Sequence, residues 1–201
     1  MAKIKYTKTE LKQQRDALRR FERYLPTLQL KKQQLQMEVR HVEQQIEAKT
    51  QEEEQARENL AHWVKLFSEP IPFEQYLRVA EIKRSVNNIA GVNVPVLDDV
   101  RFDRTQPDLF RTPPWLDDGL DMLEKLARLR LERLLLEEGH RLLVQELRIT
   151  TQRVNLFEKV KIPETRENIR IIRIFIGDQQ TAEVARAKMA KDRAMKAEAE
   201  S

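Results

Sequence analysis

The stretch LKQQRDALRRFERYLPTLQLKKQQLQMEVRHVEQQI, residues 11–46, decides the fold. Its apolar residues recur in a seven-residue register that continues to Phe67. One core row holds Leu11, Leu18, Leu25, Lys32, Val39, Ile46, Glu53, Leu60 and Phe67, and the other holds Gln14, Phe21, Leu28, Leu35, Val42, Lys49, Ala56 and Trp63. Most of these positions are apolar, and an unbroken heptad pattern of this length predicts a left-handed coiled coil. One helix cannot bury such a stripe alone, so a second helix is required.

Signals at both ends delimit this first helix. Thr7 and Glu10 match a capping box, which predicts the start of the helix. The prolines of Ser68-Glu69-Pro70-Ile71-Pro72 stop it. At 1.5 Å per residue, roughly 60 helical residues make a rod of about 90 Å.

A second long helix follows an insertion that holds six of the eight prolines, between Ser68 and Trp115. Thr112 is a candidate cap and Pro113 fits the first helical position. Two core rows are expected. They comprise Leu126, Leu147, Val154, Phe175, Ala182 and Met189, and Met122, Leu129, Leu136, Leu143, Phe157, Ile171 and Ala185, with interruptions at Arg133, His140, Thr150, Lys161, Glu164, Asn168 and Asp178.

Folding the helices back through the insertion predicts that facing residues have numbers adding to about 183. On this reckoning the kinks expected at Pro26 and Pro163 lie within two turns of each other, and residues from Gly177 onward have no partner. The insertion itself alternates apolar and polar residues at Val92, Val94 and Val96, and Asn88 to Gly91 can form a turn, so we expect a small β-hairpin.

The predicted fold class is therefore mainly α: a long antiparallel two-helix coiled coil with a small α+β insertion, the β-hairpin, at its closed end. We expect three segments: an N-terminal coiled-coil helix at 1–67, the insertion at 68–115, and a C-terminal coiled-coil helix with an overhanging tail at 116–201.

Composition excludes several classes of protein. The chain of 201 residues has no Cys, four Gly and 35% charged residues. It offers no disulfides, no thiolate metal sites and too few glycines for a sandwich or a doubly wound sheet. Its apolar runs are far shorter than the roughly 20 residues of a membrane span, and its charged amino end does not match a signal peptide, so we expect a soluble, non-secreted protein. The formal charge of +4 is too small to predict nucleic-acid binding by itself.

Candidate chemistry is sparse. The glycines are too far apart for a phosphate-binding loop, and His41, His62 and His140 show no spacing that would clasp a metal ion. Carboxylate pairs such as Glu137-Glu138 are more often solvated helix charges than acid/base pairs. We therefore expect no catalytic residue, no cofactor and no metal.

Two features remain open to interpretation. Polar residues at core rows, namely Lys32, Lys49, Glu53, Arg133 and Asn168, either meet water or another protein chain or fix the register of the helices. The row Arg166, Arg170 and Arg173 is a possible phosphate track, but Glu164 and Glu167 lie nearby and favour a solvated stripe or one that faces an acidic partner. The candidate partner contacts are Val86, Ile89, Val92, Val94 and Val96 in the hairpin and Arg166, Arg170 and Arg173 in the second helix.

Three segments resemble the D subunit of the V-type (A/V-type) rotary ATPases. Residues 153–163, Arg-Val-Asn-Leu-Phe-Glu-Lys-Val-Lys-Ile-Pro, resemble the family's Arg-Val-Asn-Ala-Leu-Glu followed after three residues by Ile-Pro. Residues 88–95 are similar to its Asn-Val-Ala-Gly-Val-Lys-x-Pro hairpin, and residues 28–35 to its Leu-Leu-Lys-x-Lys-x-x-Leu stretch. The pair Leu156-Phe157 departs from Ala-Leu but keeps an apolar core position.

The resemblance implies a non-catalytic central rotor shaft, the central stalk, that couples ion transport to ATP synthesis or hydrolysis. Its implied partners are the alternating A and B subunits of the catalytic ring, the F subunit of the central stalk, and the socket formed by the C subunit above the membrane rotor, with no nucleic acid and no direct membrane span. The implied location is the cytoplasm, peripheral to the membrane. From the residues alone, a free-standing coiled-coil scaffold or spacer and a nucleic-acid-binding arm remain alternatives.

Overall fold

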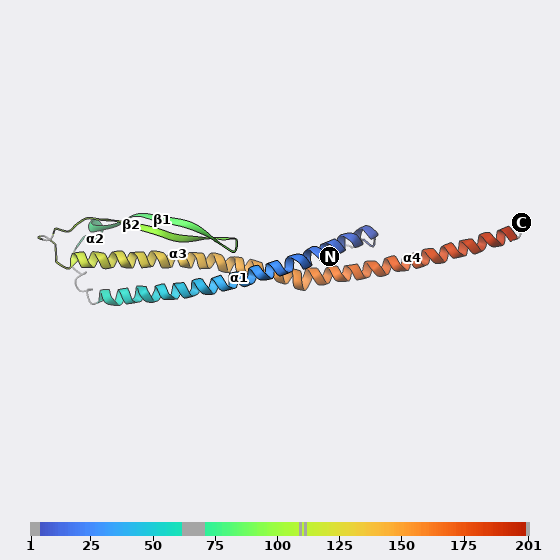
Figure 1. Ribbon diagram of the computed structural model, residues 1–201, viewed down its shortest axis with the longest axis horizontal. Coiled ribbons are helices and arrows are strands. Elements are labelled where there is room, and N and C mark those ends of the chain that lie inside the picture. Colours follow the sequence, from blue (N-terminus) through green and yellow to red (C-terminus); the bar gives the residue numbers. More distant parts are fainter. Residues whose placement is uncertain (1–4, 62–70, 109, 111, 200–201) are drawn as a thin grey trace. The chain divides into compact units, whose positions relative to one another are not determined.

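The computed structural model describes residues 5–61, 71–108, 110 and 112–199. In chain order the elements are α1 (Lys8–Ala61), α2 (Phe73–Tyr76), β1 (Leu77–Ile89), β2 (Val92–Arg104), α3 (Leu116–Asn155), the π-helical turn η2 (Leu156–Lys161) and α4 (Ile162–Ala199) (Figure 1). The predicted fold class, two long terminal helices with a β-hairpin between them, is confirmed. No helix among the described residues is long and apolar enough to cross a membrane.

The chain forms two compact units, and α1 contributes to both. The first unit comprises residues 1–30 and 150–201, and the second comprises residues 31–149. The expected division at 1–67, 68–115 and 116–201 stays a prediction, and the expected end of the first helix near Phe67 lies outside the described residues.

The start and the seam of α1 agree with the sequence pattern. The Glu10 amide donates a hydrogen bond of 3.2 Å to Thr7 Oγ1, as a capping box requires. Every heptad core position from Leu11 to Leu60 is buried or half-buried, while most residues between them are exposed. The heptad interpretation of this helix is therefore confirmed.

In both units the helices pair in antiparallel fashion. In the first unit, the rings of Phe21 and Phe157 stack with centroids 5.3 Å apart, and Tyr6 contacts Phe175. In the second unit, His140 Nε2 lies 3.0 Å from a carboxylate oxygen of Glu43, the partner expected from the predicted pairing. Contacts within each unit thus follow the predicted order.

The π-helical turn η2 changes the register of the following helix. The Ile162 amide bonds to the carbonyl of Phe157, five residues earlier, and Pro163 directly after it has no amide hydrogen to donate. A turn closed over five residues holds one residue more than an α-helical turn, so each core position moves by one. The seam uses the residue that follows each expected core position. The expected core positions were Lys161, Glu164, Asn168 and Ile171. The buried residues are Ile162, Thr165, Ile169 and Ile172.

The hairpin is longer than the sequence pattern predicts. Its strands pair antiparallel from Leu77 with Arg104 to Ile89 with Val92, whereas the alternation in the sequence covered only Val92 to Val96. The connecting residues Ala90 and Gly91 both have positive φ, 50° and 83°, which is the conformation of a two-residue hairpin turn. Two register shifts, between Val79 and Glu81 and between Lys83 and Arg84, interrupt the alternation of the strands. A search for apolar residues at every second position therefore misses the part of the hairpin farther from the turn.

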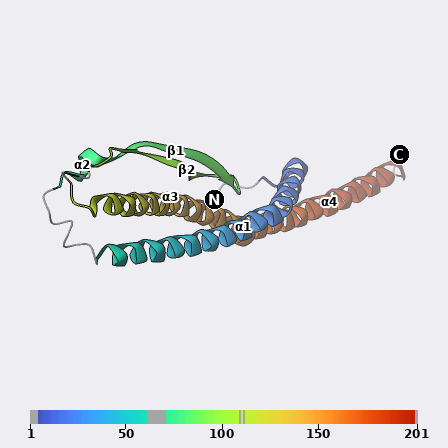
Figure 2. The same ribbon diagram turned by 60° about the vertical axis from the view of Figure 1, so that its left-hand side comes forward.

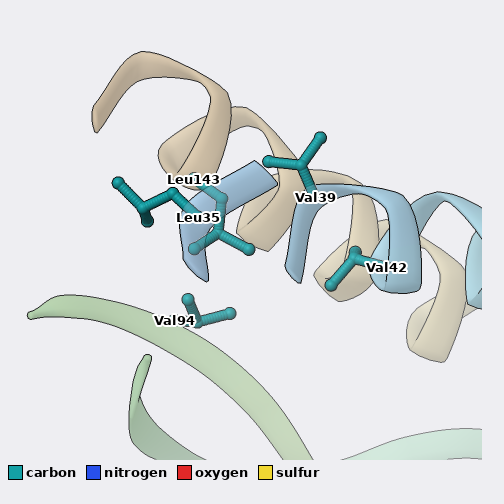
Figure 3. Close-up of a cluster of buried hydrophobic side chains, with 5 residues drawn as sticks. All are labelled: Leu35, Val39, Val42, Val94 and Leu143. Atoms are coloured by element: carbon teal, nitrogen blue, oxygen red, sulfur yellow. The ribbon is translucent and has the colours of Figure 1, made fainter. Parts of the chain in front are cut away.

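The core of the second unit joins the hairpin to both helices. Leu35, Val39 and Val42 from α1, Leu143 from α3 and Val94 from β2 form one buried cluster (Figure 3). Both ribbon views show the hairpin running alongside α3 (Figures 1 and 2). The helix-facing residues of β2 are therefore part of the fold, since Val94 and Val100 are buried.

The second long helix begins later than its cap pattern at Thr112 and Pro113 indicates. α3 begins at Leu116, and Thr112 does not cap it. The Thr112 hydroxyl instead donates to the Asp108 carbonyl at 2.7 Å, and the Leu116 amide bonds to the Pro113 carbonyl at 3.1 Å. A turn thus occupies the positions that resemble a helix start in the sequence.

Candidate functional site

Histidine and carboxylate side chains do not form a metal site in the described part of the chain. The described part of the chain holds no group of three His, Asp or Glu side chains that could bind a metal ion. His41 contacts Gln45 and His140 contacts Glu43, while His62 lies outside the described residues. The candidate functional sites are surfaces that a partner could contact, on the hairpin and along α4.

The first surface is the hairpin, and its five predicted contact residues divide into two groups. Val94 is buried in the core, and Ile89 and Val92 pack against the same cluster at its edge. Val86 and Val96 are instead exposed, by 68% and 39%. Of the five, these two present the most apolar surface to a partner.

Beside Val96 a groove of about 550 Å³ opens between α1, the hairpin and α3. Its apolar lining comes from all three elements. The apolar lining residues are Val42, Ala48, Ile89, Val94, Pro95, Val96, Leu97, Leu135 and Leu136. Glu38, His41 and Lys49 add charged and polar groups to the lining. An apolar segment with a polar edge fits this lining.

Close packing and ion pairs fix the hairpin to α3. A Cβ atom on Gly139 would lie 2.5 Å from Val94 Cγ1, so only glycine lets β2 approach the helix at this point. Farther along β2, Arg104 forms ion pairs with Asp117 and Asp121, and these carboxylates raise the pKa of the guanidinium. The sequence offered one signal for this contact, a glycine inside a leucine-rich helix.

A charge cluster around the buried Glu53 connects α1 and α3 in the second unit. Glu53 occupies a heptad core position, and its side chain is 5% exposed. Its carboxylate accepts from Arg133 Nε at 2.7 Å and from Arg57 at 2.7 Å, and Arg130 lies at 3.5 Å. Hydrogen bonding to Glu53 raises the pKa of Arg133. The two polar core residues that interrupted the predicted rows, Glu53 and Arg133, are therefore partners.

Lys49 makes a second polar link between the same helices. Its ammonium group lies 2.9 Å from Glu52 on α1 and 3.0 Å from Glu132 on α3. Hydrogen bonds to these carboxylates raise the pKa of Lys49 above its ordinary value of 10.5. Three of the polar residues at core rows therefore have ion-pair partners within the chain, namely Lys49, Glu53 and Arg133. Asn168 is not part of the seam, because the π-helical turn places the next residue, Ile169, there.

The second candidate surface lies on α4 in the first unit. Arg166 pairs with Glu22 at 2.8 Å, and Arg170 pairs with Glu167 at 2.7 Å. The Arg170 guanidinium lowers the pKa of Glu167 by hydrogen bonding. The three predicted contacts Arg166, Arg170 and Arg173 line one pocket with Leu18, Ile169 and Ile174. The expected pairing of this stripe with Glu167 is confirmed, whereas Glu164 contacts Lys161 instead.

The third candidate surface is the end of α4. The helix continues to Ala199, and both views show it extending past the N-terminal end of α1 (Figures 1 and 2). From Gly177 to Arg193, Ala182 is half-buried and the other residues are exposed. A Cβ atom on Gly177 would meet no atom within 4 Å. This exposure is what an unpaired overhang requires.

Comparisons with known proteins agree over nearly the whole chain. The profile of a family described as the D subunit of ATP synthase matches residues 10–192. The chain is 46% identical to a V-type ATP synthase D subunit from Borreliella burgdorferi, over 98% of this chain and 97% of the relative.

Two chlamydial relatives carry the same name. Identity is 37% to the protein from Chlamydia trachomatis serovar A, over 94% of this chain and 95% of the relative. It is 34% to the protein from Chlamydia felis, over 100% of this chain and 98% of the relative. Together with the paired terminal helices and the hairpin between them, these matches show that the chain belongs to the family of V-type ATP synthase D subunits.

Proposed function

We propose that this chain is the central rotor shaft of a V-type ATP synthase, transmitting torque between an ion-driven membrane rotor and a catalytic ring of A and B subunits. The observation that carries the proposal is the family match over residues 10–192. A shaft acts by turning and needs no catalytic residue of its own. In this role the chain couples ion transport to the synthesis or hydrolysis of ATP.

The packing of the helices suits this mechanical role. Antiparallel contacts join the helices in each unit, and Glu53 on α1 forms ion pairs with Arg130 and Arg133 on α3 that resist sliding. Mixed charges cover the outside, so the surface does not adhere permanently to surrounding proteins. The unpaired end of α4 offers a slender element for insertion into the ring.

The partner surfaces follow from exposure. The hairpin valines Val86 and Val96, together with the adjacent groove, are the proposed contact for the F subunit. The end of the second unit that carries the start of α3 is the proposed seat on the C subunit socket. The A and B subunits contact α4, and the assembly works at the cytoplasmic face of the membrane.

Coexpression with candidate A, B and F subunits tests the proposal. We expect the chain to copurify with the ring and with a small F-like subunit, and to stimulate ATP turnover by the ring. A chain that purifies alone, self-associates through the hairpin and leaves ring turnover unchanged would contradict the proposal and support a free-standing scaffold.

A pair of hairpin variants locates the contact with the small partner. Val86→Asp/Val96→Asp places two charges on the proposed contact and should abolish copurification of the F-like subunit. The matched control Val79→Asp changes another exposed hairpin valine outside the proposed contact, and should leave copurification intact. Equal loss in the control would place the contact elsewhere or indicate general damage to the hairpin.

A further inference from the structure

The two units differ in charge. Residues 1–30 and 150–201 together hold nineteen Lys and Arg against eleven Asp and Glu, a surplus of eight positive charges. Residues 31–149 hold eighteen against twenty-two, a surplus of four negative charges. The small net charge of the chain thus conceals a basic unit and an acidic unit, and a surface that encloses the basic unit is favoured when it is acidic.

Within the basic unit, one groove combines guanidinium groups with an aliphatic floor. Its volume is about 510 Å³. The residues that line it are Leu18, Arg166, Ile169, Arg170, Arg173 and Ile174. The arginines follow spacings of four and three along α4, so they lie on one face over two helical turns. Ile174 is 51% exposed, and a partner that covers it gains apolar burial.

The present partners of these arginines are easily exchanged. Arg166 is 63% exposed where it pairs with Glu22, and Arg170 is 62% exposed where it pairs with Glu167. Ion pairs this open to water contribute little, so carboxylates of a partner can replace them at small cost. Within the described part of the chain, Arg173 forms no ion pair, so its guanidinium is available to a new carboxylate.

We propose that this groove binds an acidic amphipathic segment of a protein, with carboxylates on the arginines and an apolar side chain on the floor. The inference rests on the proposed function, in which one of the ring proteins supplies that segment. Planar guanidinium groups match carboxylates in bidentate geometry. The aliphatic floor favours a peptide over a nucleic acid, whose phosphates gain nothing from Ile174.

A labelled peptide tests the groove in the isolated full chain. The probe is a fluorescein-labelled helical peptide that repeats Glu-Leu-Ala-Glu-Glu-Leu-Ala, and anisotropy reports its binding. Arg166→Gln/Arg170→Gln/Arg173→Gln should weaken binding about thirtyfold. Ile174→Ser should weaken it about threefold, because apolar contact is lost. The matched control Arg186→Gln/Lys188→Gln/Lys191→Gln removes the same charge from exposed positions of α4 and should change affinity less than about twofold.

Three outcomes of this experiment would overturn the proposal. The first is no binding of the acidic peptide, or equal binding of a peptide with Gln in place of Glu. The second is an equal loss of affinity in the control variant, which would show attraction to the basic unit as a whole. The third is tighter binding of oligothymidylate with the same dependence on the three arginines, which would assign the groove to nucleic acid.

Cross-linking in the assembled complex separates this inference from the proposed function. Ile174→p-benzoylphenylalanine places a photoreactive ring at the groove, and mass spectrometry identifies what it captures. The proposal expects a segment of a ring protein with Asp or Glu at helical spacing. Capture of a segment without carboxylates, in a complex that still assembles and hydrolyses ATP, would overturn the inference and leave the rotor proposal standing. If the chain binds the peptide but never joins a ring, the rotor proposal is overturned and peptide binding at the groove still stands.

Discussion

Two arginine–glutamate pairs of nearly equal length join the helices, one in each unit, and they differ in burial. Arg133 and Glu53 lie 2.7 Å apart with side chains 17% and 5% exposed. Arg166 and Glu22 lie 2.8 Å apart with side chains 63% and 43% exposed. Judged by distance alone, the two ion pairs would contribute equally to stability. Burial makes the first pair a fixed part of the core and leaves the second free to change partners.

The same contrast runs through both units. In the second unit the hairpin covers α3, the space above the glycine at 139 is filled by Val94, and polar core residues find partners across the helices. In the first unit the buried seam holds aliphatic and aromatic residues and two threonines, the charges face water, and α4 continues without a partner. The second unit is thus suited to hold a fixed register, and the first to present surfaces to other chains.

Deleting one residue from α4 should shift the helix register in the first unit and move its buried residues out of the interface with α1. Deleting Glu167 displaces Ile169 and Ile172 from the seam and should lower the free energy of unfolding by about 4 kcal/mol. Deleting Val160 together with Pro163→Ala should convert the π-helical turn to an α-helical one without moving the seam, and should cost less than about 1 kcal/mol. Urea unfolding followed by circular dichroism measures both. Equal losses would show that the π-helical turn does not set this register.

The buried pair should cost more to break than the exposed one. Arg133→Ala removes the partner on α3 that lies 2.7 Å from Glu53, and Arg57 and Arg130 remain, so the substitution should destabilise the chain by about 2 kcal/mol. Arg166→Ala should cost less than about 1 kcal/mol, because water already solvates both of its groups. Combining each with its partner substitution, Glu53→Ala or Glu22→Ala, in a double-mutant cycle isolates the two pair energies. Similar values for the two units would contradict the role assigned to burial.

Two helical glycines provide a matched comparison of packing. Gly139→Ala drives a methyl group into Val94 and should lower the free energy of unfolding by about 2 kcal/mol. Gly177→Ala enters open space and should raise it by about 0.5 to 1 kcal/mol through helix propensity. Thermal unfolding of both variants measures whether each substitution lowers or raises the free energy of unfolding. Stabilisation by Gly139→Ala would show that the hairpin does not depend on this close approach.

The smallest effect concerns pH. The folded chain raises the pKa of Lys49, so the link to Glu52 and Glu132 stabilises the fold below about pH 10.5 and is lost as the pH rises above the raised pKa. Lys49→Met should therefore be less stable than the parent chain by up to about 1 kcal/mol at pH 8, and this difference should shrink above pH 10.5. Urea unfolding of both chains at a series of pH values measures it. A difference that is constant across this range would assign the effect to packing alone.

The sequence predicted α1 well because its seam depends on local spacing. Each heptad residue from Leu11 to Leu60 could be placed without knowing its neighbours, and the antiparallel order followed from the insertion. The core positions predicted from the same spacing are wrong after Phe157, because one π-helical turn next to Pro163 shifts all later core positions by one residue. This turn lies inside residues 153–163, the segment with the most specific family resemblance, yet no count of apolar residues along one fixed period could detect it.

The candidate surfaces were predicted in kind but not in detail. Val94 was expected at a partner contact, and the structure uses it in the core, because only the pairing of the hairpin with Gly139 decides which valines face inward. Arg133, the partner of Glu53 on α3, is eighty residues away in sequence, so the role of Glu53 depended on the fold. The charge difference between the units could have been counted from the sequence, but the boundaries of the units come from tertiary structure.

Observation of rotation tests the central claim most directly. The chain has no native Cys, so Lys83→Cys on the exposed part of β1 provides a single attachment point for a gold bead. With the catalytic ring fixed to a surface, a shaft should turn the bead in one direction, in steps that require ATP. Continued ATP turnover with the chain bound and the bead stationary would contradict the account.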